Sequence, residues 1–314
     1  MNNPFAEDVE KGLAARQKYL PSKYFYDEKG NALFIQIMQM PEYYLTDCEM
    51  EIFAEQSKDL IQAFEVQDEK FELYELGAGD GSKTIELIKG LDHSSFKFIP
   101  IDISEHVLEI LHDRLQEEVP DLRVETRQGD YFEMLGTISS PLKKIILFLG
   151  SNIGNLTDVE ARSFISRIAS KMNPKDMFLL GVDLKKSARI ILAAYNDPGG
   201  ITRRFNLNLL ERINKELGGT FDTKKFSHQP VYSSTTGYAI SYLRSKCDQE
   251  VSIRDLSRSF KFRKGETIHM EISRKYDLKA IRRMIHGSGL ELKKVFYDKK
   301  KFFGDILLEK RSGS

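Results

Sequence analysis

A glycine-rich loop in the first third of the chain has the residue types of a cofactor site. The loop reads E-x-G-x-G-x-G and begins at Glu75. Its glycines are Gly77, Gly79 and Gly81. Residues 71–76 alternate as in a strand, and residues 85–89 have helical spacing. Glycines allow positive φ and a close ligand approach, and the start of the following helix offers free N–H groups. The sequence therefore predicts a strand, a tight turn and a helix around a bound cofactor.

Three cofactor classes use loops of this kind. A dinucleotide fingerprint needs its third glycine at position 82, which is Ser82. A P-loop would read G-x-x-x-x-G-K-T, but residues 77–84 are one glycine short, and the apolar run 145–149 ends without a carboxylate for magnesium. The loop as it stands resembles that of class I S-adenosylmethionine (SAM) methyltransferases. A P-loop-like nucleotide-binding module and a merely connecting turn remain alternatives.

Two acidic residues follow strands of the same region. Asp102 ends the predicted strand 96–102, where nucleoside-binding folds place a carboxylate that accepts hydrogen bonds from ribose. Asp130 follows the predicted strand 122–128, and its carboxylate beside Tyr131 is suited to an adenine amine covered by a ring. The alternatives are a cap for the next helix at Asp102 and a surface turn at Asp130.

An asparagine-containing loop follows the most apolar strand, residues 144–149. Because ligands of open α/β sheets bind beyond the carboxyl ends of the strands, this loop should border the same crevice as the glycine loop. An asparagine side chain can accept from an amine and donate to a carboxylate. Asn152 or Asn155 could therefore hold an amino-acid headgroup, while Thr157 with Glu160 has capping-box spacing for the next helix.

Composition narrows the function class. The 314 residues include 47 basic and 47 acidic side chains, which argues against a general nucleic-acid or membrane-surface binder. Cys48 and Cys247 are far apart, so no disulfide framework or thiolate metal site is indicated and a cytoplasmic location is expected. The six histidines show no metal-ligand spacing. No apolar run approaches the length of a membrane span.

The order of elements predicts an α/β protein. Strands and helices alternate from residue 71 to 185, which is typical of a parallel sheet. Several short β-like runs then break this alternation, and strands at 290–297 and 302–310 should form an antiparallel end of the sheet. Before residue 65 the sequence predicts helices, one of them capped at Thr46 with Glu49 three residues on.

Five segments occur in the order seen in one family. They are Leu20–Asp27, Pro41–Thr46, Glu75–Lys83, Phe148–Leu156 and Met270–Ser273. The chain resembles the histidine-specific, SAM-dependent Nα-methyltransferases, which make hercynine, the trimethylated betaine of histidine, for ergothioneine biosynthesis. The likeness spans nearly the whole chain.

The resemblance implies a role for individual residues, with SAM as co-substrate and no metal. The residues implied for SAM are Gly77, Lys83, Asp102, Asp130 and Tyr131, with Gly79 in the same loop. Those implied for the amino and carboxylate groups of histidine are Tyr43, Asn155 and Tyr195, of which Tyr43 and Asn155 are the catalytic candidates. Those implied around the imidazole are Tyr26, Glu271 and Ser273. The partner would be the amino acid alone, with no nucleic acid or membrane, and the protein would be a monomer.

The family fold joins a Rossmann-like SAM-binding domain, here 66–187 and 287–314, to an α+β substrate-binding domain, here 1–65 and 188–286. One position departs from the family. Ser241 stands where methionine often lines the imidazole pocket. An alternative substrate is therefore another amine, such as tryptophan or a tryptophan derivative.

Overall fold

The structure is a computed structural model that describes residues 3–67 and 69–311. The chain divides into two compact units, each built from two segments. The large-sheet unit comprises Leu45–Lys185 and the chain from Arg274 on. The small-sheet unit comprises the chain up to Tyr44 and Lys186–Ser273.

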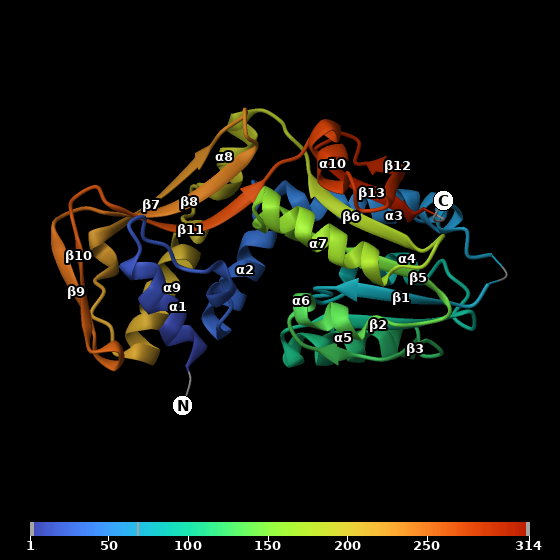
Figure 1. Ribbon diagram of the computed structural model, residues 1–314, viewed down its shortest axis with the longest axis horizontal. Helices are drawn as coiled ribbons and strands as arrows, with labels where there is room; N and C mark the ends of the chain where they lie inside the picture. Colours follow the sequence, from blue (N-terminus) through green and yellow to red (C-terminus); the bar gives the residue numbers. More distant parts are fainter. Residues whose placement is uncertain (1–2, 68, 312–314) are drawn as a thin grey trace. The chain divides into compact units, whose positions relative to one another are not determined.

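The large-sheet unit contains an open sheet whose strands follow the order β12-β13-β6-β5-β1-β2-β3, with β4 also paired to β2 (Figure 1). The strands are β1 (Phe71–Leu76), β2 (Phe96–Asp102), β3 (Arg123–Val124), β4 (Arg127–Gln128), β5 (Lys143–Phe148), β6 (Met177–Asp183), β12 (Leu290–Tyr297) and β13 (Phe303–Lys310). Pairing is parallel from β3 to β6 and antiparallel at β13 and β12. This is the Rossmann-like sheet with an antiparallel end that the sequence predicts.

Helices cover the large sheet because its strands are apolar on both faces. They are α3 (Tyr44–Phe64), α4 (Ser82–Ile88), α5 (Glu105–Glu118), α6 (Tyr131–Met134), α7 (Asp158–Lys171) and α10 (Leu278–Ile285). Buried residues of α7 and α10 share one core with alternate residues of the strands, such as Tyr74 and Phe148. The intervening strand residues, such as Leu73 and Ile145, are fully buried as well. Both faces of the sheet are therefore covered.

The small-sheet unit has a separate core. Its helices are α1 (Pro4–Ala14), α2 (Glu28–Met38), α8 (Ala188–Tyr195) and α9 (Ile201–Leu217). Its strands are β7 (Phe226–Tyr232), β8 (Tyr238–Ser245), β9 (Gln249–Ile253), β10 (Arg258–Phe262) and β11 (Thr267–Arg274). Strands β11, β8 and β7 form one sheet with β8 in the middle, and β9 pairs with β10 (Figure 1). The short 3-10 helices of the chain are η1 (Ser22–Phe25), η2 (Leu135–Thr137), η3 (Asn152–Asn155), η4 (Thr223–Lys225) and η5 (Arg254–Leu256).

Two features of the N-terminal half differ from the sequence prediction. Helix α3 begins at Tyr44, so Thr46 lies inside the helix and does not cap it. Glu49 is buried instead of exposed in a capping box. The predicted strand 122–128 is split into β3 and β4, which pair with different parts of β2.

The unit boundaries also differ from the predicted ones. Residues 45–65 belong to the large-sheet unit, because α3 carries side chains such as Ile52 and Phe53 that are fully buried there. Residues 274–286 belong to it too, because Ile281 and Met284 of α10 complete its core. Which unit holds cofactor and which holds substrate stays a prediction. No helix in the described ranges combines the length and apolarity that a membrane crossing requires.

Candidate functional site

The glycine loop joins β1 to α4 in a conformation that needs glycine. Gly77, Gly79 and Gly81 have φ of 70°, 57° and 68°, in the left-handed region where side chains are disfavoured. The N–H of Gly77 donates to the carbonyl of Ile101 at 2.8 Å, which holds the loop against the end of β2. A Cβ built on Gly79 would meet nothing within 4 Å, so this part of the loop faces open space. The backbone there is accessible to a ligand.

Asp102 lies next to this loop. One carboxylate oxygen accepts from the N–H of Gly79 at 3.1 Å, and the other accepts from the N–H of Ser104 at 3.0 Å. Helix α5 is capped by the Ser104 side chain and not by Asp102. The carboxylate is thus fixed at the carboxyl end of β2, beside the open face of Gly79. Its contact with ribose stays a prediction.

Asp130 and Tyr131 follow β4 at the same edge of the sheet. The Asp130 side chain caps α6 by accepting from the N–H of Phe132 at 2.8 Å. The Tyr131 ring packs edge-on against Phe148 at 5.3 Å and Phe164 at 6.0 Å. Burial, with the nearby charges of Asp130 and Asp102, raises the pKa of Tyr131 to about 12. Tyr131 therefore keeps its proton at neutral pH, and an adenine role for either residue stays a prediction.

Lys83, on the first turn of α4, is tied to a glutamate of α3. Its ammonium group forms an ion pair with Glu49, whose side chain is 1% exposed. Both oxygens of Glu49 also accept from the N–H of Gly150, at 2.8 and 3.0 Å. Burial disfavours the charged lysine, but the charge and hydrogen bond of Glu49 outweigh this and raise the pKa of Lys83. The glycine loop, the loop after β5 and α3 are therefore joined at one buried carboxylate.

A second buried acid lies beside Glu49. A Cβ built on Gly181 of β6 would lie 2.3 Å from a Glu49 oxygen and 3.3 Å from an oxygen of Asp305 on β13. Burial, followed by the charge of Glu49, raises the pKa of Asp305 well above its usual range. Two carboxylates buried this close together disfavour each other's ionised form.

Glu75, the first residue of the glycine motif, is also buried. One oxygen accepts from the Thr84 hydroxyl at 2.8 Å. The other, Oε2, has no hydrogen-bond partner within the described part of the chain. Burial raises the pKa of Glu75 to about 8, although the Thr84 hydrogen bond and Lys83 oppose the rise. A buried carboxyl oxygen without a partner next to an open glycine backbone fits a loop that contacts a polar ligand.

The loop after β5 carries the two asparagines. Ser151 adopts a positive φ of 59°, and its hydroxyl accepts from the N–H of Asp183 at 2.9 Å. The Asn152 amide nitrogen lies 3.4 Å from a Cβ built on Gly77, so this side chain faces the glycine loop. Asn155, at the end of η3, is exposed. The predicted capping box of Thr157 and Glu160 is present and starts α7.

The predicted aromatic substrate residues lie in the small-sheet unit. Tyr26 and Tyr43 both contact the ring of Phe34, at 5.5 and 6.5 Å between centroids. Tyr195, at the end of α8, is 9% exposed and belongs to a small apolar cluster against which Tyr43 also packs. The structure therefore gathers the three tyrosines into one aromatic region, and their contact with a substrate stays a prediction.

Glu271 and Ser273 lie on β11 of the same unit. The Ser241 hydroxyl, on β8, donates to Glu271 Oε1 at 3.1 Å. His228, on β7, lies behind Ser241, with Nε2 at 3.2 Å from the serine oxygen. Ser241, the departure from the family, is thus bonded directly to the residue implied for the imidazole.

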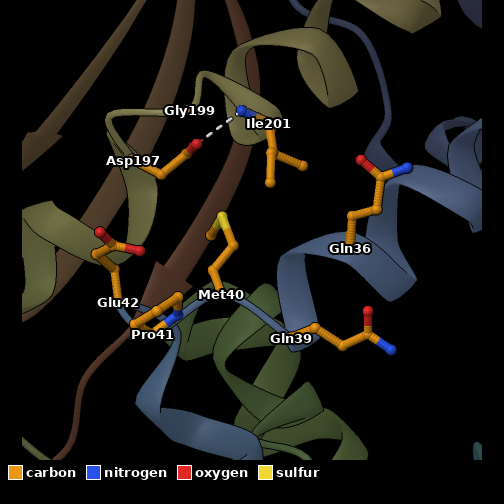
Figure 2. Close-up of a pocket in the computed structure, with 8 residues that line it drawn as sticks. All are labelled: Gln36, Gln39, Met40, Pro41, Glu42, Asp197, Gly199 and Ile201. Atoms are coloured by element: carbon orange, nitrogen blue, oxygen red, sulfur yellow. Dashed lines mark hydrogen bonds between the residues drawn. The ribbon is translucent and has the colours of Figure 1, made fainter.

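A cavity of about 380 Å³ opens beside the predicted substrate segment (Figure 2). Met40 and Ile201 point toward each other across it, and the Asp197 carboxylate accepts from the N–H of Ile201 at 2.7 Å. The lining residues are Gln36, Gln39, Met40, Pro41, Glu42, Asp197, Gly199 and Ile201. None of the predicted substrate side chains lines this cavity, although Tyr43 and Tyr195 are close to it in sequence.

The sequence prediction missed Glu49, Asp305 and His228. Glu49 shares the helical stripe of Leu45, Cys48 and Ile52, and a charge on an apolar stripe is a sign of a buried acid. Asp305 interrupts residues 303–308 of β13, which are buried and otherwise apolar. His228 carried no such signal. Among the described residues, no group of three or more His, Cys, Asp or Glu side chains is arranged to hold a metal ion.

Comparisons with known proteins bear on this site. The family described as histidine-specific, SAM-dependent methyltransferase matches residues 5–310. The chain is 36% identical over 305 residues to the histidine N-alpha-methyltransferase of Mycobacterium tuberculosis, covering 96% of this chain and 94% of that protein. It is 23% identical over 309 residues to the N-methyltransferase imqF of Aspergillus flavus, covering 95% of this chain and 82% of that protein.

One solved structure illustrates the fold. The mitomycin 7-O-methyltransferase MmcR superposes with a TM-score of 0.50 at 13% identity, covering 91% of this chain and 59% of that one. At this identity the likeness concerns the fold alone.

The raised pKa of Glu75 predicts how stability depends on pH. An unfolded glutamate loses its proton near pH 4.5, whereas the folded protein retains it up to about pH 8. The folded state then binds more protons across this window, so this residue lowers the free energy of unfolding as pH rises from 4.5 to 8. Glu75→Gln has no proton to lose and should exceed the wild type at pH 7 by on the order of 3 kcal/mol.

Urea unfolding of both proteins at pH 5, 7 and 8 measures this difference. Glu86→Gln on the exposed side of α4 is the control, and its difference from the wild type should not change with pH. A Glu75→Gln difference that stays constant from pH 5 to 8 would contradict the raised pKa.

Proposed function

The chain belongs to the family of histidine-specific, SAM-dependent methyltransferases, and from this membership we propose that it trimethylates the α-amino group of L-histidine to hercynine. The observation that carries the proposal is the 36% identity to a histidine N-alpha-methyltransferase along almost the full length of both chains. As a SAM-dependent methyltransferase the protein requires a cofactor loop and an amine site. The proposal assigns residues to each.

SAM supplies an electrophilic methyl group on a sulfonium. The open backbone at Gly79, the fixed carboxylate of Asp102 and the unpartnered oxygen of Glu75 fit such a polar nucleoside ligand. In the proposal Gly77 and Gly79 approach SAM through their backbone, while Asp102 accepts from its ribose. Asp130 and Tyr131 take the adenine. Lys83 also belongs to the proposed SAM site and remains ion-paired with Glu49.

The amine must present a lone pair in line with the methyl group, so most of the acceleration comes from positioning and exclusion of water. In the proposal Tyr43 and Asn155 orient the α-amino group, and Tyr195 helps to hold the carboxylate. A peptide-like α-amino group has a pKa of about 8, so a proton must leave before attack. Proton loss then proceeds through Tyr43 or water. Glu271, with Tyr26 and Ser273, holds the imidazole.

Another amine is the second candidate substrate. Ser241 is smaller than the methionine common in the family, and the N-methyltransferases related to this chain include fungal ones. A tryptophan-like amine therefore stays an alternative. The P-loop alternative is dropped, because the family is one of methyltransferases and Lys83, its main support, is ion-paired with Glu49.

Mass spectrometry tests the substrate. Purified protein incubated with SAM and L-histidine should add one, two and three methyl groups to the amino acid, which appear as successive 14 Da increments, with tryptophan and tryptamine as parallel samples. Increments on tryptophan and none on histidine would reject the proposed function and favour the alternative amine.

We expect Glu271 to contribute to the binding of histidine and not to the binding of SAM. Glu271→Ala removes the acceptor for the imidazole and should raise the KM for histidine about 10-fold to 100-fold, with little change for SAM. Glu271→Gln keeps one acceptor oxygen, so its KM for histidine should lie between those of the wild type and Glu271→Ala. Steady-state kinetics with each ligand varied separates these effects, and equal losses for both ligands would contradict the assignment.

Asn155 should act on turnover. Asn155→Ala leaves the amine without one of its orienting groups and should lower kcat by about 100-fold. Isothermal titration with SAM checks that cofactor binding is retained. Near-normal turnover would remove Asn155 from the headgroup site.

A further inference from the structure

Three polar side chains cross the small sheet in strand order. His228 lies on the edge strand β7, Ser241 on the middle strand β8 and Glu271 on the other edge strand, β11. Nε2 of His228 is 3.2 Å from the Ser241 oxygen, and that hydroxyl is 3.1 Å from Glu271 Oε1. The three side chains therefore form one continuous hydrogen-bond chain.

The donor and acceptor in each hydrogen bond of this chain follow from the number of hydrogens that the side chains carry. Serine has a single hydroxyl hydrogen, and the Glu271 carboxylate can only accept. The hydrogen of Ser241 is therefore committed to Glu271, and the serine oxygen must accept from His228. Nε2 of His228 then carries the hydrogen.

His228 fills this role as a neutral ring. Burial lowers its pKa to about 4, and the charges that act on it, Asp197 and Arg203, oppose each other. At neutral pH the ring therefore carries one hydrogen. Placing that hydrogen on Nε2 satisfies Ser241, whose side chain is only 1% exposed and which would otherwise lose a partner away from water.

We propose that His228 is a positioning residue for substrate recognition, which acts through Ser241 to hold the Glu271 carboxylate in the orientation that accepts the imidazole N–H. This inference rests on the proposed function, because it needs Glu271 to bind the substrate. Glu271 would select an amino acid whose side chain carries an N–H donor as far from the α-carbon as that of an imidazole.

The hydrogen-bond chain orders the Glu271 carboxylate before a substrate binds. A carboxylate held at one oxygen by a hydroxyl loses little freedom when a substrate donor arrives, so less binding energy goes into ordering it. A methionine at position 241 has no hydrogen to donate and leaves that oxygen without this support. In this protein Ser241 has a hydrogen-bond partner, His228, on the neighbouring strand.

Kinetics of two variants test the proposal. Ser241→Ala and His228→Leu should each raise the KM for histidine about 10-fold, while kcat and the KM for SAM change less than about 3-fold. The double variant should be no worse than either single one, because His228 acts only through Ser241. An unchanged KM for histidine, equal changes for both ligands, or losses that add in the double variant would each overturn the proposal.

Two further variants serve as controls. His228→Gln retains an Nε donor and should keep the KM for histidine within about 3-fold of the wild type. His269→Gln changes another partly buried imidazole, which packs against Tyr242 on the same sheet and should leave that KM unchanged. A His228→Gln variant as impaired as His228→Leu would show that the ring fills space and does not act as a donor.

A spectroscopic measurement needs no substrate and holds even if His228→Leu fails to fold. In protein labelled with ¹⁵N-histidine, the His228 resonances, assigned by their loss in His228→Gln, should show a hydrogen on Nε2 and none on Nδ1 at pH 7. The opposite tautomer or a charged ring would overturn the proposal.

The proposed function and this inference fail in different ways. If Glu271→Ala leaves the KM for histidine unchanged, the assignment of Glu271 to the substrate fails, and the hydrogen-bond chain has no role in recognition. If Glu271→Ala raises that KM while Ser241→Ala and His228→Leu do not, only the positioning role of His228 is wrong.

Discussion

In the large-sheet unit, one buried carboxylate joins three segments of the chain. Glu49 is almost inaccessible to water, so its carboxylate must be satisfied within the protein. The donors are the Lys83 ammonium, on the first turn of α4, and the backbone N–H of Gly150, in the loop after β5. Since removing one partner of a buried pair leaves an uncompensated charge, both segments are held in place together. Position 181 must remain glycine, because a Cβ there would overlap Glu49.

Periodicity was enough to predict the elements of that unit. Parallel strands buried on both faces give continuous apolar runs, and β1, β2 and β5 lie within a residue or two of their predicted bounds. The glycine loop and Asp102 were predicted because their chemistry depends on neighbours close in sequence or on the regular geometry of the sheet. Glu49 was misinterpreted as part of a capping box, because its partner Gly150 is 101 residues away. A local pattern cannot distinguish a capping glutamate from a buried one.

The residues proposed for the substrate were assigned by resemblance and not by physical reasoning. Their positions in the chain run from Tyr26 to Ser273, and what brings Tyr26 and Tyr43 together is the ring of Phe34 between them. Nothing in the sequence near any of them shows this contact. The same limit applies to His228, whose relation to Glu271 passes through the middle strand of a small antiparallel sheet. Strand order, which short β-like runs do not reveal, decides which polar residues meet.

The two units satisfy their central carboxylates by different means, and this difference has consequences for specificity. Glu49 is held by a full positive charge, so changing it disturbs the cofactor loop and the fold together. Glu271 accepts from the neutral hydroxyl of Ser241, in a unit with a separate core. If Glu271 binds the substrate as proposed, substitutions at positions 241 and 228 should change which side chains it accepts, while the residues proposed for SAM belong to the other unit. Substrate preference would then be set by the hydrogen-bond chain of His228, Ser241 and Glu271.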